Sequence, residues 1–289
     1  MRAASDPDLR VYGIFGYPLA HTVSPAIQNC AFDFYGLKSI YFAFERPRAR
    51  FRYLMRNLKS LLLDGFNVTV PYKETVISYL DGLSREAKLI GAVNTVKKEG
   101  RRWVGYNTDS YGFLAGLKSA HFKAKGKSAV ILGAGGSARA VSFALASNEI
   151  KEVSIANRSS FRARSLVQKF KTLFPKVKWQ VLSLGGHDFK KVLSQADLIV
   201  NATKVGLKTK DSPLVPSGYF PRRKILVYDL IYRPSETQLL KRASRLGHRT
   251  VNGETMLIYQ GAKAFQIWTG RSAPIQKMKR AFQDAIRSR

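Results

Sequence analysis

Short apolar runs alternate with longer segments of helical spacing along most of this sequence. In the first third, VYGIFGY (11–17), SIYFAFE (39–45) and GFNVTV (65–70) are strand candidates bounded by Gly, Pro or polar residues. The two segments between them have apolar residues at helical spacing and end at glycines 36 and 65. This order predicts a parallel sheet covered by helices, with functional groups on loops beyond the carboxyl ends of the strands.

The alternation starts again near residue 110. Further strand candidates follow at 128–135, 152–158, 178–184, 197–203 and 224–231, and helix candidates at 137–148, 160–174 and 237–247. These strand candidates are rich in Val, Ile and Leu, as a doubly wound sheet that is buried on both faces requires. The last 35 or so residues read as two helices, 253–270 and 273–289. We therefore expect an α/β protein whose second domain begins near residue 110.

Composition narrows the class of protein. The 289 residues are 45% hydrophobic, and a single cysteine excludes an intramolecular disulfide. The net charge of +30 would attract phosphates, but the basic residues are dispersed and no zinc-finger or RNA-binding motif accompanies them, so a nucleic-acid partner is not favoured. No stretch approaches the roughly 20 apolar residues that span a bilayer, and no apolar signal segment starts the sequence. We expect a soluble, cytoplasmic protein without a membrane partner or a metal.

A glycine turn lies directly between an apolar strand and a helix, in VILGAGGSARA. Gly133, Gly135 and Ala138 stand in a G-x-G-x-x-A arrangement: the first glycine allows a tight turn, the second lets the backbone approach a pyrophosphate, and Ala138 permits close helix packing. The start of the helix, with Ala134, Gly136 and Ser137 in the turn, supplies N–H groups to phosphates. The spacing predicts a dinucleotide site.

The end of the next strand indicates which dinucleotide binds. NAD sites usually place Asp or Glu there, whereas NADP sites place cations. This strand ends in IANRSSFRAR, where Asn157, Arg158, Ser159 and Arg162 offer an amide, two guanidinium groups and a hydroxyl without a carboxylate. The two arginines could simply belong to a basic helix start, but cations disfavour that position unless an anion is bound. We therefore expect NADP.

Several further motifs occur together, in one order along the whole chain. They are GYPLAHTVSP (16–25), FNVTVPYKE (66–74), GAVNTV (91–96), GYNTDSYG (105–112), NATKVG (201–206), DLIYRPSET (229–237) and NGETMLIYQGAKAFQIWTG (252–270). With the glycine turn, they resemble the shikimate dehydrogenase family of NADP-linked enzymes. The resemblance implies an α/β substrate domain (1–109) completed by helices from about 254–289, and a Rossmann NADP domain (110–253).

The family's functional residues can be assigned wherever its motifs match. The resemblance implies that Lys73 is the general acid and base, with Asp109 as its partner. It implies that the following residues contact the substrate: Thr22, Ser24, Asn67, Thr69, Asn94, Tyr232 and Gln260. It also implies that Thr203, Leu230, Gly253 and Met256 belong to the cofactor site. A polyhydroxylated acid needs many such hydroxyls and amides, since each buried hydroxyl must be hydrogen-bonded.

Local structural roles remain open for some of these residues. Ser24 precedes a proline and could cap a helix, and Asn94 could cap a turn. Lys73 could be one solvated cation among 49 lysines and arginines. Its place after a strand end, where such folds bind ligands, favours a functional role.

One residue departs from the family pattern. The family usually has serine where this sequence has Thr22, in HTVSP, so the hydroxyl is kept and a methyl is added. A methyl in a pocket changes discrimination by about 1–3 kcal/mol, so preference among shikimate, quinate and related acids could shift. The reaction expected is reduction of 3-dehydroshikimate to shikimate by a monomer or homodimer. The alternatives are a quinate/shikimate dehydrogenase or related paralogue and, less favoured, a non-catalytic basic binding protein.

Overall fold

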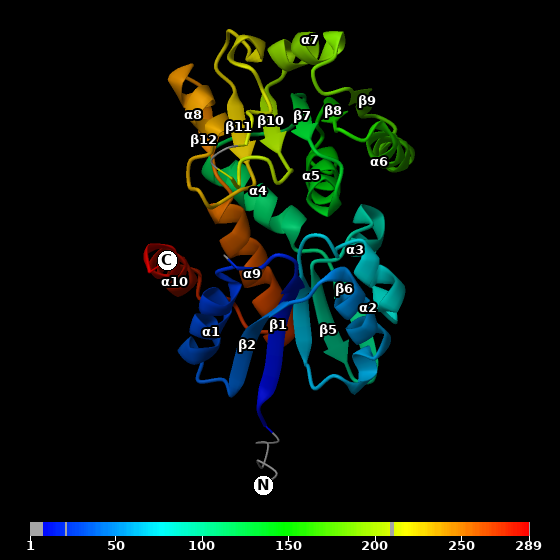
Figure 1. Cartoon of the computed structure of the whole chain (residues 1–289), viewed down its shortest axis with the longest axis vertical. Coiled ribbons are helices and arrows are strands. Elements are labelled where there is room, and N and C mark those ends of the chain that lie inside the picture. The colour runs from blue at the N-terminus through cyan, green and yellow to red at the C-terminus, as the bar shows by residue number, and fades with distance from the viewer. Residues whose placement is uncertain (1–7, 21, 209–210, 289) are drawn as a thin grey trace. The chain divides into compact units, whose positions relative to one another are not determined.

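The structure is a computed structural model that describes residues 8–20, 22–208 and 211–288. It divides into two compact units: residues up to Thr108 together with those from Ile258 onward, and Asp109–Leu257 (Figure 1). Helix α9 (Glu254–Thr269) runs from the second unit into the first.

The first unit contains one six-stranded sheet in the order β2-β1-β3-β5-β6-β4. Its strands are β1 (Arg10–Gly16), β2 (Ser39–Glu45), β3 (Gly65–Val68), β4 (Gly82–Leu83), β5 (Thr95–Glu99) and β6 (Arg102–Tyr106). Its helices are α1 (Ser24–Phe34), α2 (Arg48–Arg56), α3 (Arg85–Ile90), α10 (Ile275–Arg287) and most of α9, with 3₁₀ turns at Leu58–Ser60 and Thr75–Tyr79.

The expected parallel arrangement is right for β1, β2 and β3, and β4 also pairs parallel with β6, but the expectation is wrong for β5. β5 pairs antiparallel with both β3 and β6. β5 and β6 form a hairpin whose turn contains Gly100 at φ +61°. A short connection of this kind can join only antiparallel strands, because a parallel pair needs a crossover of a dozen or more residues.

The expected helix between 48 and 65 is also shorter than its pattern suggested. α2 ends at Arg56, a 3₁₀ turn follows, and Gly65 begins β3. Asp64 takes a different role, because its carboxylate accepts the Val11 N–H at 2.9 Å and pairs with Arg10 at 2.8 Å. These contacts hold the segment before β3 against β1, which a continued helix would prevent.

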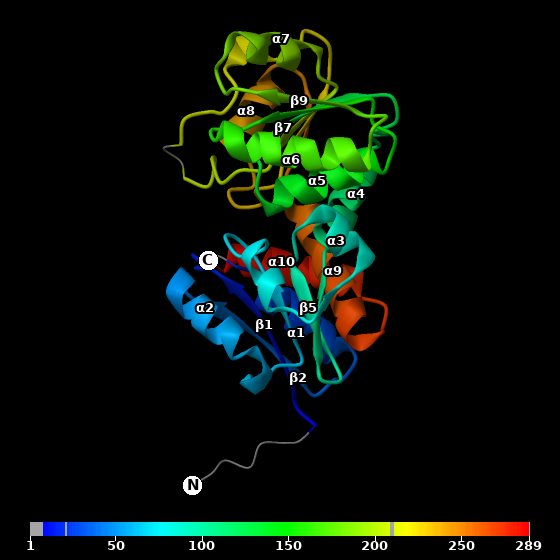
Figure 2. The ribbon, with the colours of Figure 1, turned by 90° about the vertical axis from the view of Figure 1, so that its right-hand side faces the viewer.

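Aromatic side chains fill both faces of the first sheet. On the face covered by α2, Phe51 stacks on Tyr72 with ring centroids 3.9 Å apart. On the opposite face, Trp268 of α9 donates from Nε1 to the Val96 carbonyl at 2.9 Å. Gly65 makes room for this contact, since a Cβ there would lie 2.5 Å from Trp268 Nε1. Trp268 therefore attaches α9 to β3 and β5, and Figure 2 shows α9 along one side of the first unit's sheet.

β2 is an edge strand, and a side chain of α1 makes hydrogen bonds to the backbone of one residue on its free edge. Asn29 of α1 accepts the Tyr41 N–H with Oδ1 at 2.8 Å and donates from Nδ2 to the Tyr41 carbonyl at 3.1 Å. The side-chain amide thus takes the place that a peptide group of a neighbouring strand would have.

The second unit contains a fully parallel sheet in the order β12-β11-β10-β7-β8-β9. Its strands are β7 (Ser128–Leu132), β8 (Glu152–Ala156), β9 (Lys178–Leu182), β10 (Leu198–Asn201), β11 (Leu226–Asp229) and β12 (Arg249–Val251). Its helices are α4 (Asp109–Ser119), α5 (Gly136–Ala146), α6 (Ser160–Leu173), α7 (His187–Gln195) and α8 (Gln238–Arg245), with a 3₁₀ turn at Ser217–Tyr219.

Both faces of this sheet are covered. One apolar cluster joins the strands to α4, α5 and α6, and another joins them to α7 and α8 (Figure 1). Neighbouring strand residues divide between the clusters, with Ile131 in the first and Val130 and Leu132 in the second. The expected doubly wound arrangement is confirmed, and it explains why these strands read as continuous apolar runs.

Candidate functional site

One edge of the first sheet collects several loops. β1 and β3 run parallel and end there, at Gly16 and Val68. Because β5 is antiparallel to β3, it begins at this same edge, and β6 ends there. The segments around residues 17–20, 22–24, 69–74, 92–94 and 107–108 therefore meet at the carboxyl end of β3.

The hydroxyls of Thr22 and Ser24 lie together in the loop after β1. Thr22 Oγ1 donates to Ser24 Oγ at 3.3 Å, and the Ser24 N–H donates to Thr22 Oγ1 at 3.4 Å. Ser24 is the first residue of α1, whose N-cap is Val23 and has no side-chain cap. A capping role for Ser24 is therefore wrong, and its buried hydroxyl faces Thr22 instead.

Lys73 lies in the turn between β3 and the following 3₁₀ turn, and its side chain is half-buried. Two backbone hydrogen bonds fix this turn. The Thr69 N–H donates to the Phe15 carbonyl at 2.9 Å, and the Lys73 carbonyl accepts the Val93 N–H at 2.8 Å. The turn is thus tied to β1 on one side and to the segment leading into β5 on the other.

Buried amides and hydroxyls occupy the same edge. Asn67 Nδ2 donates to the Asn94 carbonyl at 3.0 Å and to Thr95 Oγ1 at 2.9 Å. Asn94 Oδ1 accepts the Thr108 N–H at 2.8 Å, and Asn94 Nδ2 lies 3.2 Å from Gln260 Oε1 of α9. The structure therefore brings Asn67, Asn94 and Gln260 into one network, which we call the first-unit network with its other members Tyr41, Thr95 and Thr108.

In the second sheet, the glycine turn follows β7 at the point where the strand order reverses between β7 and β10. Gly133 has φ +115°, and a Cβ there would lie 3.0 Å from the Ala202 carbonyl. At Gly135, a Cβ would meet nothing within 4 Å, so protein packing does not explain this glycine. A ligand that approaches the backbone would explain it.

The start of α5 suits a phosphate. Gly135 is its N-cap without a side-chain cap, and no acidic residue lies in its first turn. Ala138 is fully buried, which lets α5 pack closely on the strands. The turn from Gly133 to Ala138, including Ala134, Gly136 and Ser137, therefore has the geometry that a pyrophosphate needs.

The start of α6 carries the predicted 2′-phosphate residues. Ser159 is the N-cap and accepts the Arg162 N–H, while Asn157 Nδ2 donates to the Ser159 carbonyl at 2.9 Å. Arg158 and Arg162 are exposed beside this cap. The structure thus gathers all four residues at the carboxyl end of β8, with two guanidinium groups on the surface.

A second buried network orders the loops after β10 and β11. Asn201 Nδ2 donates to Asp229 Oδ1 at 3.0 Å, and Thr237 Oγ1 donates to Asp229 Oδ2 at 2.7 Å. Asn201 Oδ1 accepts from the Thr203 N–H at 3.0 Å and from its hydroxyl at 2.8 Å. We call Asn201, Thr203, Asp229 and Thr237 the second-unit network.

Burial raises the pKa of the Asp229 carboxyl above its ordinary value, although hydrogen bonds from Thr237, the Ile231 N–H and Asn201 lower it. These bonds hold Leu230 and Ile231 in place directly after β11. The network therefore fixes the two loops that contain Thr203 and Leu230.

The remaining predicted residues lie in several places. Gly253 packs against the same loop, since its Cβ would lie 2.1 Å from the Leu230 carbonyl. Met256 is 7% exposed and belongs to the apolar cluster that includes α4 and α5. Tyr232 is half-buried in the loop after β11, and Asp109 is buried as the first residue of α4. Lys73 belongs to the first unit and Asp109 to the second, so their pairing stays a prediction.

Six members of the two networks had no role assigned from the sequence: Tyr41, Thr95, Thr108, Asn201, Asp229 and Thr237. Most of them lie inside the quoted motifs GAVNTV, GYNTDSYG, NATKVG and DLIYRPSET, so the motifs were the available signal. Tyr41 lies outside every motif, and no pattern in the sequence could reveal its hydroxyl contact.

Two further properties bear on the class of site. In the part of the chain that the structure describes, no three His, Cys, Asp or Glu side chains are grouped to hold a metal ion. Within the same residues, none of the helices combines the length and apolar content that crossing a bilayer requires.

A parallel sheet in this order, with a glycine turn at its switch point and cations after the second strand, defines the class of NADP-binding dehydrogenase domains. Family models match along the chain: the shikimate dehydrogenase substrate binding domain at residues 14–96, the shikimate/quinate 5-dehydrogenase at 116–225 and the shikimate 5′-dehydrogenase C-terminal domain at 253–281. The chain belongs to the shikimate dehydrogenase family.

Individual relatives extend over nearly the whole chain. A shikimate dehydrogenase (NADP⁺) of Methanopyrus kandleri is 42% identical over 98% of both chains. The Thermus thermophilus shikimate 5-dehydrogenase, solved in complex with NADP(H) and shikimate, is 36% identical with a TM-score of 0.83, covering 96% of this chain and all of that one. A Corynebacterium glutamicum quinate dehydrogenase, solved with NAD, is 30% identical with a TM-score of 0.85, covering 96% and 99%.

Proposed function

We propose that this protein catalyses the reversible reduction of 3-dehydroshikimate to shikimate with NADPH. The observation that supports this most directly is the single edge of the first sheet where the hydroxyls of Thr22 and Ser24, Lys73 and the first-unit network are gathered. In this proposal, residues 1–109 with the C-terminal helices from about 254 bind the substrate, and residues 110–253 bind NADP.

Each residue proposed for substrate binding or proton transfer has a chemical task. The paired hydroxyls of Thr22 and Ser24 donate hydrogen bonds to the substrate carboxylate. Thr69, Asn67, Asn94, Tyr232 and Gln260 hold its hydroxyl and carbonyl oxygens. Lys73 transfers a proton to the carbonyl oxygen during reduction and takes it back in the reverse direction, with Asp109 orienting it.

The cofactor residues have separate tasks. NADPH, when bound, supplies the hydride that reduces the carbonyl carbon. The turn from Gly133 to Ala138 holds the pyrophosphate at the start of α5, and Arg158 and Arg162 hold the 2′-phosphate with Asn157 and Ser159. The nicotinamide side of the site is formed by Thr203, Leu230, Gly253 and Met256.

A spectrophotometric assay tests the proposal. Purified protein should consume NADPH when 3-dehydroshikimate is added and should produce shikimate, with NADH a much poorer cofactor. Absence of turnover with 3-dehydroshikimate, in protein that still binds NADPH, would contradict the proposed reaction.

The methyl group of Thr22 favours one alternative, a quinate/shikimate dehydrogenase. This methyl lies where the carboxylate is bound, so it could change preference among related acids by about 1–3 kcal/mol. Steady-state rates on shikimate and quinate, with Thr22→Ser as the matched variant, measure this preference. A quinate rate comparable to the shikimate rate would favour the alternative.

We also propose that the protein acts in the cytoplasm as a monomer or homodimer and has no nucleic-acid partner. The net charge of +30 leaves a non-catalytic binding protein as the competing possibility. Salt-sensitive binding to DNA or RNA, combined with a lack of dehydrogenase activity, would favour that possibility over catalysis.

A further inference from the structure

The first-unit network determines how its amide groups are oriented. An amide side chain has a carbonyl that only accepts and an amino group that only donates, so a fixed neighbour decides which end faces it. Five members of the network, Tyr41, Asn67, Asn94, Thr95 and Thr108, are 5% exposed or less. Inside the unit they must satisfy one another, because buried polar groups without partners are costly.

The orientation of Asn67 is set by a backbone carbonyl. Its Nδ2 lies 3.0 Å from the Asn94 carbonyl, which can only accept, so the amino group must face that oxygen. Asn67 Oδ1 then faces the Tyr41 hydroxyl at 2.7 Å, and the hydroxyl must donate. Burial raises the pKa of Tyr41 well above its ordinary value, so this hydroxyl keeps its proton.

The orientation of Asn94 is set by a backbone N–H. Its Oδ1 lies 2.8 Å from the Thr108 nitrogen, which can only donate. The Thr95 hydroxyl accepts from Asn67 Nδ2, so its own proton goes to Asn94 Oδ1 at 3.1 Å. Asn94 Nδ2 therefore faces the Thr108 hydroxyl at 2.9 Å and Gln260 at 3.2 Å.

These constraints decide the orientation of Gln260. Its carbonyl oxygen must face Asn94 Nδ2 at 3.2 Å, because that amino group can only donate. The Thr108 hydroxyl lies 3.2 Å from Asn94 Oδ1 and 3.4 Å from the same Gln260 oxygen. The amino group of Gln260 is the other substituent on the same carbon, so it is not the end that contacts Asn94.

We propose that Thr95 and Tyr41 are positioning residues for substrate binding. Acting through Asn94 and Asn67, they hold Gln260 so that its amino group donates a hydrogen bond to a substrate oxygen. This inference rests on the proposed function, in which Gln260 contacts the substrate. The oxygen it recognises is an acceptor, such as a keto or hydroxyl oxygen of the ring.

Kinetics on matched variants test the positioning role. Thr95→Val should raise the KM for 3-dehydroshikimate about tenfold and Tyr41→Phe about fivefold, each with kcat within about threefold and an unchanged KM for NADPH. Tyr228→Phe is the control, because it removes a buried hydroxyl that has no hydrogen-bond partner among the described residues. Its substrate KM should stay within about twofold. The same KM for 3-dehydroshikimate in all three variants would overturn the positioning role.

A second variant tests which end of Gln260 is used. Gln260→Glu keeps an oxygen that can accept from Asn94 Nδ2 but removes the amino group. We expect kcat/KM for 3-dehydroshikimate to fall about a hundredfold, since the substrate oxygen would then face a carboxylate. A fall of less than about threefold would show that the amino group is not the donor.

A substrate-free measurement separates this inference from the proposed function. In protein labelled with ¹⁵N at Asn and Gln side chains, the amide signals of Asn94 and Gln260 are identified by their loss in Asn94→Asp and Gln260→Glu. Thr95→Val should speed hydrogen exchange of the Asn94 amino group at least about tenfold, whereas Tyr228→Phe should not. Unchanged exchange in Thr95→Val would overturn the network. Wild-type protein that fails to reduce 3-dehydroshikimate would instead overturn the proposed function.

Discussion

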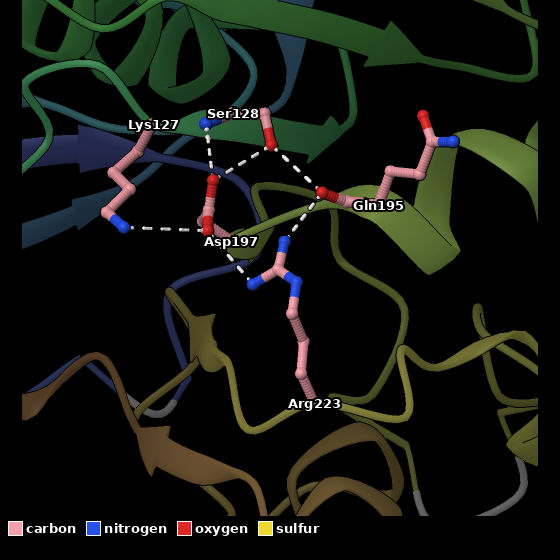
Figure 3. A network of polar contacts seen from close by, with 5 residues as sticks. All are labelled: Lys127, Ser128, Gln195, Asp197 and Arg223. Carbon is pink, nitrogen blue, oxygen red and sulfur yellow. Dashed lines mark hydrogen bonds and ion pairs between the residues drawn. The ribbon is translucent and has the colours of Figure 1, made fainter.

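The two ends of the second sheet contain polar networks of opposite kinds. At the amino ends of β7 and β10, Asp197 accepts the Ser128 N–H at 2.9 Å and pairs with Arg223 at 2.9 Å and Lys127 at 3.8 Å (Figure 3). The Gln195 carbonyl, at the end of α7, accepts from Arg223 at 2.7 Å. This cluster is partly exposed and joins α7 to the strand starts.

At the carboxyl ends of β10 and β11, no cation pairs with the second-unit network among the residues that the structure describes. Asp229 is fully buried and accepts hydrogen bonds from Asn201, Thr237 and the Ile231 N–H. The pKa values of the two aspartates differ accordingly. Burial raises the pKa of Asp229, whereas hydrogen bonds and cations outweigh burial at Asp197 and lower its pKa.

The comparison separates stability from ligand binding within one domain. At the amino end of the sheet, the cations of Arg223 and Lys127 compensate the charge of Asp197, which suits a structural role. At the carboxyl end, buried neutral groups and the Asp229 carboxylate hold loops in place, and the N-cap of α5 makes no side-chain hydrogen bond, which suits the proposed phosphate site. We therefore expect substitutions at carboxyl ends to change activity and substitutions at amino ends to change stability.

The largest expected effect concerns the carboxyl end of β3 in the first unit. Lys73→Ala should lower kcat about a hundredfold to ten-thousandfold, because the proton donor is lost. Asp109→Ala should behave similarly. Neither should change NADPH binding or the urea midpoint by much. A kcat for Lys73→Ala close to that of wild type would show that this end of the sheet does not supply the proton donor.

Asp229→Ala is an exception to the expected division between activity and stability, because it should change both stability and cofactor binding. Asp229→Ala leaves the Ile231 N–H, Asn201 and Thr237 without their acceptor, so we expect a loss of about 2–4 kcal/mol in the free energy of unfolding and weaker NADPH binding. Thr237→Val removes one donor and should lose less. Urea unfolding with an unchanged slope measures the change. A loss below about 0.5 kcal/mol in Asp229→Ala would contradict the role of the network.

A smaller effect tests whether the carboxyl end of β8 binds the 2′-phosphate of NADPH. Arg158→Ala and Arg162→Ala should each raise the Kd for NADPH about tenfold and leave the Kd for NADH nearly unchanged, because only NADPH has the 2′-phosphate. Arg164→Ala is the control: it lies on the same helix and is bonded to Ser160 at 3.0 Å. Equal effects of Arg158→Ala on both cofactors would refute the 2′-phosphate assignment.

The smallest effect belongs to the amino end. Because the folded pKa of Asp197 lies below its ordinary value, its ionised form stabilises the fold at pH values above the unfolded pKa of about 4, and this contribution is lost as pH falls through the folded pKa. Asp197→Asn should therefore lower stability by about 1 kcal/mol at neutral pH, with a smaller difference at acid pH. Dehydrogenase activity should not change. A loss of activity without a loss of stability would contradict the comparison.

Regular elements were the most predictable part of the molecule. β2 was expected at 39–45 and lies there, and α6 was expected at 160–174 and ends at Leu173. Both have dense apolar periodicity and clear boundaries. The hairpin of β5 and β6 was missed because its outer residues, such as Lys97 and Lys98, interrupt the apolar pattern.

The sequence motifs supplied the residues proposed for the site, whereas the hydrogen bonds among them could not be predicted. Glycine spacing between a strand and a helix located the turn at Gly133 and Gly135, and the positive φ of Gly133 shows why that first position favours glycine. The contact between Tyr41 and Asn67 joins residues 26 apart on strands that are not neighbours. Only the strand order and the register bring them together, and neither can be predicted from the residues on each strand alone.

The amide of Asn29 on the free edge of β2 has a consequence for the protein at high concentration. An exposed edge strand can recruit a strand of another molecule, which begins aggregation. Here an incoming strand would first have to displace both hydrogen bonds that Asn29 makes to Tyr41. Asn29 thus protects against association between sheets, although it lies on a helix and belongs to neither the substrate residues nor the cofactor residues.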